Sequence, residues 1–195
     1  MGPLLLFTDR LQARSPLVAV VAAAVRAGVR SVVLRERDLP WPSRLALARI
    51  LNAVLEPAGG RLLVAGPTPE TSERMFDGCH LALRDPWPGA VTGLFGCSCH
   101  TTAELAAAAR AGARYATLSP IFASTSKPGY GPALGPEGLS CPRPLPVYAL
   151  GGVEDPGRVR ACWEAGAAGV AVMGAVMRAD DPQAVTSALL RAVAA

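Results

Sequence analysis

The sequence predicts a single (β/α)8 barrel over residues 1–195, and three observations carry this prediction. Short apolar runs alternate with longer amphipathic segments along the chain. The runs are apolar at nearly every position, as in parallel strands that are covered on both faces. Three amphipathic segments end in Ala-Gly before an apolar run, at 27–29, 111–113 and 165–167, where glycine can end a helix and turn the chain into a strand.

Eight apolar runs are the strand candidates. They cover 4–8, 31–36, 61–65, 79–83, 91–98, 115–119, 147–151 and 169–173. Helices are expected near 16–28, 42–56, 69–76, 102–112, 156–166 and 181–194. The proline-rich RDPWPG after the fourth run leaves room only for an abbreviated helix or none. An open doubly wound sheet is the alternative, but no Gly-x-Gly-x-x-Gly motif follows the first run.

The composition is that of a soluble, cytoplasmic protein. The net charge of +4 comes from 19 basic and 15 acidic residues, and the basic residues are scattered along the chain. With few aromatic residues beside them, they do not form the basic stripe of a nucleic-acid surface. No apolar run approaches the roughly 18 residues that span a bilayer, and the first residues lack the basic leader of a signal peptide. We therefore expect no nucleic-acid or membrane partner.

Five cysteines, an odd number without secretory context, argue against a disulfide framework. The CSCH segment has the residue types of a metal site, but zinc sites usually space their cysteines by two or more residues. We expect Cys97 and Cys99 to be small buried residues on one side of a strand.

In such a barrel, functional residues lie where each strand ends and its following loop begins. Arg35 and Glu36 end the second run and Arg37 follows it, while Asp85 follows the fourth run and His100 the fifth. We expect Glu36 to form an ion pair with Arg35, Arg37 or a neighbouring lysine.

The loops after the last three runs suit an anionic, oxygen-rich ligand. Ser124, Ser126 and Lys127 supply hydroxyl groups and an ammonium group on the loop 119–135, which we expect to act as a lid. Glycines follow the seventh and eighth runs, and glycine lets the backbone approach an anion closely. The sequence therefore predicts phosphate binding by Gly151, Gly152 and Gly174, with ordinary tight turns as the alternative.

The ordered motifs resemble the family of thiamine phosphate synthase and its TenI relatives. They are LFTDR, VVLRERD, CHLALRD, GCSCHTTAEL, LSPIFASTSK, YALGGV and AGAAGVAVMGAV, spread over nearly the whole chain. The resemblance implies a TIM barrel that binds a small phosphorylated thiazole. The synthase joins this thiazole to a pyrimidine pyrophosphate and releases pyrophosphate with Mg²⁺. Some TenI members instead isomerise a thiazole carboxylate phosphate into its aromatic tautomer.

The sequence departs from the synthase pattern in the part that handles pyrimidine and magnesium. Val33, Arg35 and Arg37 stand where the synthase has Gln, Arg and Lys, and a valine cannot hydrogen-bond the pyrimidine edge. Ala65–Gly66 replaces an Asn-Asp pair whose Asp holds magnesium. Asp85 remains as a metal ligand if the enzyme is synthase-like.

These departures favour a TenI-like thiazole tautomerase without a cofactor. His100 is the expected catalytic base, with Cys97 or Cys99 as alternatives. Substrate and phosphate binding are assigned to Arg35, Arg37, Ser124, Ser126, Lys127, Gly151, Gly152 and Gly174. One alternative is a thiamine phosphate synthase with Mg²⁺; a second is a non-catalytic sensor or partner protein that binds the thiazole phosphate. The family also implies that a homodimer can form.

Overall fold

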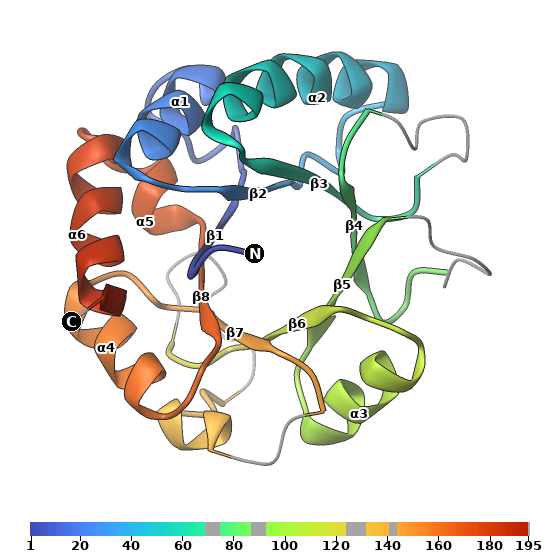
Figure 1. Ribbon diagram of the computed structural model, residues 1–195, viewed down its shortest axis with the longest axis vertical. Helices are drawn as coiled ribbons and strands as arrows, with labels where there is room; N and C mark the ends of the chain where they lie inside the picture. The colour runs from blue at the N-terminus through green and yellow to red at the C-terminus, as the bar shows by residue number, and fades with distance from the viewer. Residues whose placement is uncertain (69–74, 87–92, 124–131, 141–143, 195) are drawn as a thin grey trace.

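Eight parallel strands form a closed barrel in the computed structural model, which describes residues 1–68, 75–86, 93–123, 132–140 and 144–194 (Figure 1). Each strand pairs with the next along the chain, and β8 closes the ring against β1, with Leu4 opposite Val170. The predicted (β/α)8 class is confirmed. The strands are β1 Leu4–Phe7, β2 Ser31–Leu34, β3 Arg61–Ala65, β4 Gly78–Ala82, β5 Leu94–Cys99, β6 Tyr115–Leu118, β7 Val147–Leu150 and β8 Gly169–Val172.

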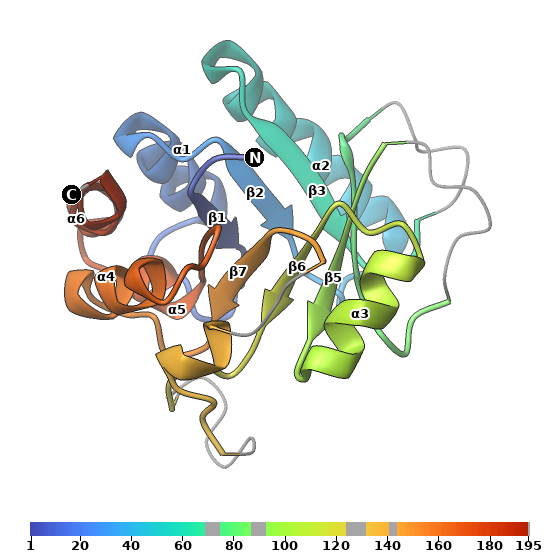
Figure 2. The ribbon, with the colours of Figure 1, turned by 60° about the horizontal axis from the view of Figure 1, so that its bottom comes forward.

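Helices surround the barrel on the outside, and Figure 2 shows the strand arrows pointing toward one end of it. Of the helix expected at 69–76, residues 69–74 lie outside the described residues, and Met75 and Phe76 are not helical. After β4 the chain makes a turn at 83–84. The helices are α1 Leu17–Ala27, α2 Trp41–Leu55, η1 Glu56–Ala58, α3 Thr102–Arg110, η3 Pro136–Leu139, α4 Pro156–Glu164, α5 Gly174–Met177 and α6 Pro182–Ala194.

The strand side chains form two buried layers. Alternate residues such as Leu5 and Leu63 fill the inside of the barrel, while their neighbours, such as Leu6, pack outward beneath the helices. Because successive strand residues face opposite sides, a strand covered on both faces is apolar throughout. Cys97 and Cys99 are buried in the outer layer, on one side of β5 as predicted.

The three Ala-Gly repeats end α1, α3 and α4. Gly28, Gly112 and Gly166 have φ angles of 120°, 88° and 87°, which residues with a Cβ rarely adopt. The N–H of Ala113 donates to the carbonyl of Ala108, so the last turn of α3 is closed before the chain enters β6. These glycines give the sequence its repeated helix-to-strand connection.

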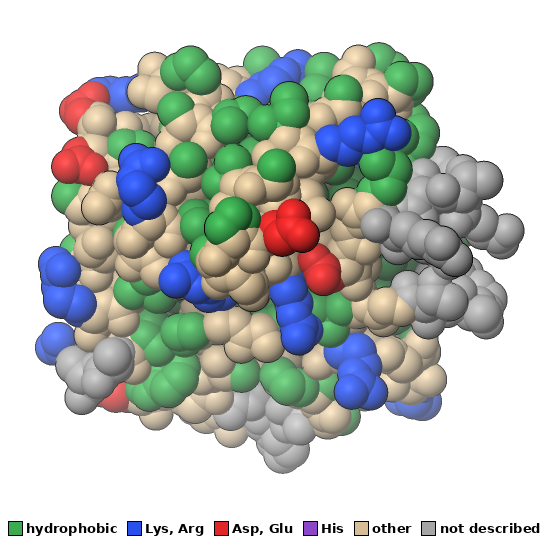
Figure 3. Space-filling model, turned by 45° about the horizontal axis from the view of Figure 1, so that its top comes forward, with side chains coloured by type: hydrophobic (Ala, Val, Ile, Leu, Met, Phe, Trp, Pro, Cys, Tyr) green, Lys and Arg blue, Asp and Glu red, His purple; other side chains and the backbone are tan. Residues whose placement is uncertain are grey.

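Charged side chains form separate groups on the face shown in Figure 3, over the helices and loops. This agrees with the scattering of arginines along the sequence. Within the described ranges, no helix combines the length and the apolar character needed to cross a membrane.

Candidate functional site

The carboxyl ends of the eight strands meet at one end of the barrel, which we call the mouth. The parallel topology brings the loops after β2, β4, β5, β7 and β8 together there, as predicted. The predicted residues on these loops are Arg35, Arg37, Asp85, His100, Gly151, Gly152 and Gly174. Ser124, Ser126 and Lys127, on the loop after β6, lie outside the described residues.

Arg37 and Asp85 form a two-pronged ion pair across the loops after β2 and β4. The Nη1 and Nη2 atoms of Arg37 lie 3.0 and 2.7 Å from the two carboxylate oxygens, and the N–H of Ala82 donates to one of them at 2.8 Å. Asp85 is only 6% exposed. Burial acts to raise the pKa of the Asp85 carboxyl, but the hydrogen bonds from Arg37 and Ala82 outweigh it and lower the pKa. The carboxylate is therefore charged, and both of its oxygens already accept hydrogen bonds.

The residues around Asp85 do not fit a magnesium ion. Both of its oxygens accept hydrogen bonds, and the neighbouring loop after β3 offers Gly66 in place of an oxygen ligand. A Cβ on Gly66 would lie 3.4 Å from Cζ of Arg37, so the guanidinium fills this side of the site. Among the residues that the structure describes, no group of three or more His, Cys, Asp or Glu side chains could hold a metal. The cation beside Asp85 is an arginine.

Arg35 extends across the loop after β1 toward β8. Its N–H donates to Thr8 Oγ1 at 3.0 Å, and its Nη1 lies 3.3 Å from Asp9 Oδ2 and 3.8 Å from the sulfur of Met173. Met173 directly precedes Gly174, so this predicted substrate-binding cation lies beside the predicted phosphate loop.

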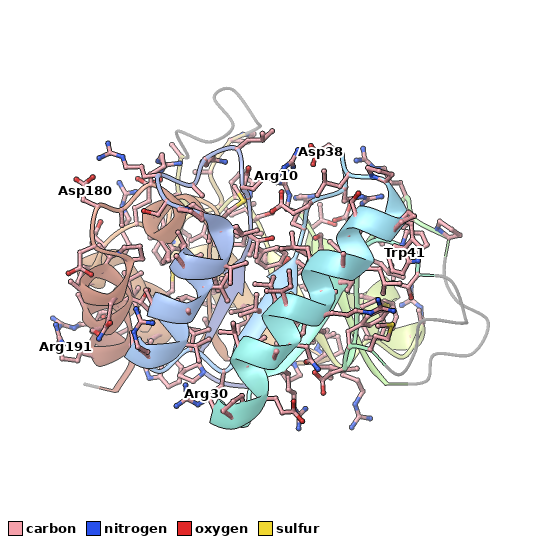
Figure 4. All side chains as sticks on the ribbon, turned by 90° about the horizontal axis from the view of Figure 1, so that it is seen from above. Arg10, Arg30, Asp38, Trp41, Asp180 and Arg191 are labelled. Carbon is pink, nitrogen blue, oxygen red and sulfur yellow. The ribbon has the colours of Figure 1, made fainter. Side chains whose placement is uncertain are left out.

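Glu36 pairs with Arg10, and not with Arg35 or Arg37 as expected. Its buried carboxylate accepts hydrogen bonds from the N–H and Nη1 of Arg10, at 3.1 and 3.0 Å. Asp38 also accepts from Arg10, and Figure 4 shows the two side by side above the start of α2. The Arg10 hydrogen bond lowers the pKa of Asp38. Arg10 thus pairs with both acidic side chains of this loop. Glu36 therefore neutralises neither Arg35 nor Arg37, which pair with Asp9 and Asp85.

Arg178 lies against Gly174, and sequence reasoning missed it. A Cβ on Gly174 would be 2.2 Å from Nη1 of Arg178, so a side chain at this position would require the guanidinium to shift. Arg178 donates to Gln12 Oε1 at 2.5 Å and to Glu154 Oε1 at 3.2 Å, and so bridges the loops after β1 and β7. The residue could have been found only through α5, because that unpredicted helix places 174 and 178 one turn apart.

Gly151 and Gly152 form the close turn predicted after β7, with φ angles of 93° and 64°. A Cβ on Gly151 would lie 2.9 Å from Cα of Pro120, and one on Gly152 would lie 2.4 Å from the carbonyl oxygen of Ala123. The two glycines therefore let the start of the loop 119–135 pack directly on this turn. Their binding of phosphate stays a prediction.

His100 is oriented by the end of β6. Its Nδ1 lies 2.8 Å from the carbonyl oxygen of Ser119, which can only accept, so Nδ1 carries the proton. The backbone N–H of His100 donates to the side chain of Glu104. The backbone N–H of Glu104 donates to the hydroxyl of Thr101, which caps α3. The ring is therefore held at the mouth by the end of β6, and its role as a base stays a prediction.

Comparison with known proteins agrees with this architecture. The family model described as thiamine monophosphate synthase matches residues 4–176. A protein of Geobacter sulfurreducens, provisionally named a thiamine-phosphate synthase, is 37% identical over 96% of this chain and 92% of its own. The thiamine-phosphate synthase of Roseiflexus castenholzii is 33% identical over 96% of this chain and 86% of its own.

A solved structure shows the same fold. The thiamine phosphate pyrophosphorylase of Pyrococcus furiosus superposes with a TM-score of 0.85, at 24% identity, over 98% of this chain and 95% of its own. The family model, the two relatives and the ordered motifs of the mouth lead to one conclusion. This chain belongs to the thiamine monophosphate synthase family of thiamine-biosynthesis enzymes.

Proposed function

We propose that the protein is a thiamine-phosphate synthase, which joins a phosphorylated thiazole to a pyrimidine pyrophosphate and releases pyrophosphate. The observation that carries the proposal is the identity of 37% and 33%, over 96% of the chain, to relatives with this name. It reverses the preference drawn from the sequence alone, where the synthase was the alternative to a tautomerase.

The residues at the mouth divide between the two substrates in this proposal. The phosphate of the thiazole lies at Gly151, Gly152 and Gly174, where the backbone can approach it closely. The pyrophosphate lies toward Arg35 and Arg37, because negative charge grows on it as its bond to carbon breaks, and fixed cations stabilise that charge. Mg²⁺ would supply the same stabilisation in the family, but the described residues beside Asp85 do not fit it, so we assign no step to the metal.

A thiazole tautomerase is the second candidate, and one observation favours it. Both carboxylate oxygens of Asp85 accept hydrogen bonds from Arg37, and position 66 is a glycine without a side-chain oxygen. The site therefore lacks the oxygen ligands that a magnesium pyrophosphate would need. Proton transfer within a thiazole needs only a positioned base, and the ring of His100 is held at the mouth by the carbonyl oxygen of Ser119.

A parallel assay separates the two candidates. One reaction contains the purified protein, thiazole phosphate, pyrimidine pyrophosphate and Mg²⁺; a second contains the same substrates with EDTA; a third contains only the unaromatised thiazole carboxylate phosphate. Formation of thiamine phosphate in either of the first two supports the synthase. Tautomerisation alone, falling at least about tenfold in His100→Asn as expected for a lost general base, would replace it with the second candidate. Saturable binding without turnover would leave only a sensor.

A further inference from the structure

A cavity of about 510 Å³ lies at the amino ends of β3 to β6, at the end of the barrel opposite the mouth. The strand arrows of Figure 2 point away from this end. Arg61 is the first residue of β3 and Arg114 directly precedes β6, so the two arginines lie on the outer two of the four strands. Nothing in the proposed function uses this cavity. Its other lining residues are Asp77, Gly93, Leu94, Phe95 and Gly112.

The guanidinium groups of Arg61 and Arg114 are available to a ligand. Both residues are exposed, and neither side chain forms an ion pair or hydrogen bond with another residue in the described part of the chain. Arg30, at the same end of the barrel, shows the other use of such an arginine (Figure 4). Its Nη1 donates to the carbonyls of Val25 and Val29, at 3.0 and 2.9 Å, where α1 has ended. The two arginines of the cavity do not stabilise a helix end in this way.

Asp77 lies in the same cavity but pairs with neither arginine. Its Oδ2 accepts the N–H of Leu62 at 2.8 Å, its own N–H donates to the carbonyl of Leu62, and its carbonyl accepts the N–H of Leu94. These contacts join the starts of three neighbouring strands, which gives Asp77 a structural role. Two arginines against one aspartate leave an excess of one positive charge in the cavity, so its potential favours an anion.

We propose that this cavity binds a small molecule with a diphosphate group, one phosphoryl group contacting each arginine. Guanidinium groups bind phosphate oxygens through two parallel hydrogen bonds. Neighbouring strands are about 4.8 Å apart, so three spacings separate the backbones of Arg61 and Arg114 by about 14 Å along the sheet. An elongated anion with two charged groups suits this separation better than a compact one. The volume leaves room for an organic part beside Leu94 and Phe95.

A two-dimensional ¹H–¹⁵N magnetic resonance titration with sodium pyrophosphate locates the binding. The backbone amides of Leu94 and Gly112 should shift in one saturable step, which weakens as NaCl is added. Inorganic phosphate, which engages only one arginine, should bind there at least about tenfold more weakly. The amides of Gly151 and Gly174 report the mouth separately. Shifts confined to the mouth, or equal affinity of the two anions at Leu94 and Gly112, would reject the inference.

Arginine variants test which cations hold the pyrophosphate. Arg61→Gln and Arg114→Gln should each weaken the binding reported by Leu94 by at least about tenfold, because each removes a charge-assisted contact. Arg30→Gln is the matched control, since it removes the same charge at the same end from a guanidinium that already binds α1. It should change the affinity by less than about twofold. Equal losses in all three variants would indicate general attraction by net charge and would overturn the proposed site.

Asp77→Asn should have the opposite effect. The amide oxygen can still accept the N–H of Leu62, while the negative charge in the cavity is lost. Pyrophosphate binding should therefore strengthen by about two- to fivefold at low ionic strength. Weaker binding by a variant with an otherwise unchanged spectrum would contradict an anion site. The inference is independent of the reaction at the mouth, so an inactive wild type would refute the proposed function and leave these outcomes to decide the cavity.

Discussion

At the scale of single residues, two glycines lie where the side chain of another residue packs against the backbone. A Cβ on Gly96 would lie 2.0 Å from Cζ of Tyr115, so the tyrosine ring occupies the space above this glycine. A Cβ on Gly174 would lie 2.2 Å from Nη1 of Arg178, so a side chain at position 174 would require the guanidinium to shift. The positions of these two polar side chains therefore depend partly on missing Cβ atoms.

The buried hydroxyl of Thr117 lowers stability. Thr117 is completely buried, and its Oγ1 has no hydrogen-bond partner within the described part of the chain. Thr117→Val keeps the shape and removes the unpaired polar group, so we expect the free energy of unfolding to rise by about 1 kcal/mol in urea denaturation. The control is Thr8→Val, which should lower it by about 1–2 kcal/mol because it removes the acceptor of the Arg35 N–H. A lower free energy of unfolding in both variants would contradict the prediction.

Magnesium should bind the free protein weakly. With both oxygens of Asp85 engaged by Arg37, calorimetric titration with MgCl₂ should give no saturable binding tighter than about 1 mM. Arg37→Met releases the carboxylate and should strengthen magnesium binding, whereas Arg35→Met, which leaves Asp85 paired, should not. Tight binding by the wild type would show that ligands beyond the described residues complete a metal site.

At the scale of elements, local signals define where helices begin and end. The side chain of Asp155 accepts the N–H of Arg158 at 2.9 Å, Pro156 opens α4, and Gly166 follows its end. Asp155→Ala should lower the free energy of unfolding by about 1 kcal/mol, while Asp155→Asn keeps an acceptor and should cost only a few tenths. Glu164→Ala, at the exposed other end of α4, is the control and should be nearly neutral. An equal cost for Ala and Asn would argue against the cap.

At the scale of the whole molecule, the buried His80 makes stability depend on pH. Its pKa is about 3 in the folded protein, against about 6.5 when exposed, so between these values the unfolded chain binds a proton that the folded chain does not. Stability should therefore be flat between pH about 6.5 and 8 and fall below pH 6.5, by up to about 1.4 kcal/mol per pH unit. Asp38 and Asp85, with lowered pKa values, add to the loss only below pH about 4.

Urea denaturation at intervals between pH 7 and pH 5 measures this dependence. His100→Asn retains the buried histidine and should keep the slope. His80→Gln should be less stable at pH 7 but show no slope between pH 7 and pH 5. A wild-type profile that is flat over this range would mean that His80 accepts a proton in the folded state.

The sequence by itself determined the barrel, the mouth and the family. Most strands and helix ends follow from residues that are close along the chain, so the apolar runs and the Ala-Gly repeats were enough to predict them. The short helix α5 was not predicted, and Met75 and Phe76, which were expected in a helix, are not helical. Parallel strands end on the same side, so the residues after each run could also be assigned to one mouth. The exact reaction could not be predicted from the apolar runs, because it depends on which side chains contact one another at the mouth.

Only the tertiary structure decided the partners within the mouth. Arg37 and Asp85 are 48 residues apart, and Arg178 and Gln12 are 166 apart. His80 meets Tyr115 across 35 residues, through a space that Gly96 leaves open. Closing eight strands into a ring sets these distances, and nothing in the local pattern of any one strand records them. The physical reason is that propensity and period act over a few residues, whereas a hydrogen bond depends on position to within a few tenths of an ångström.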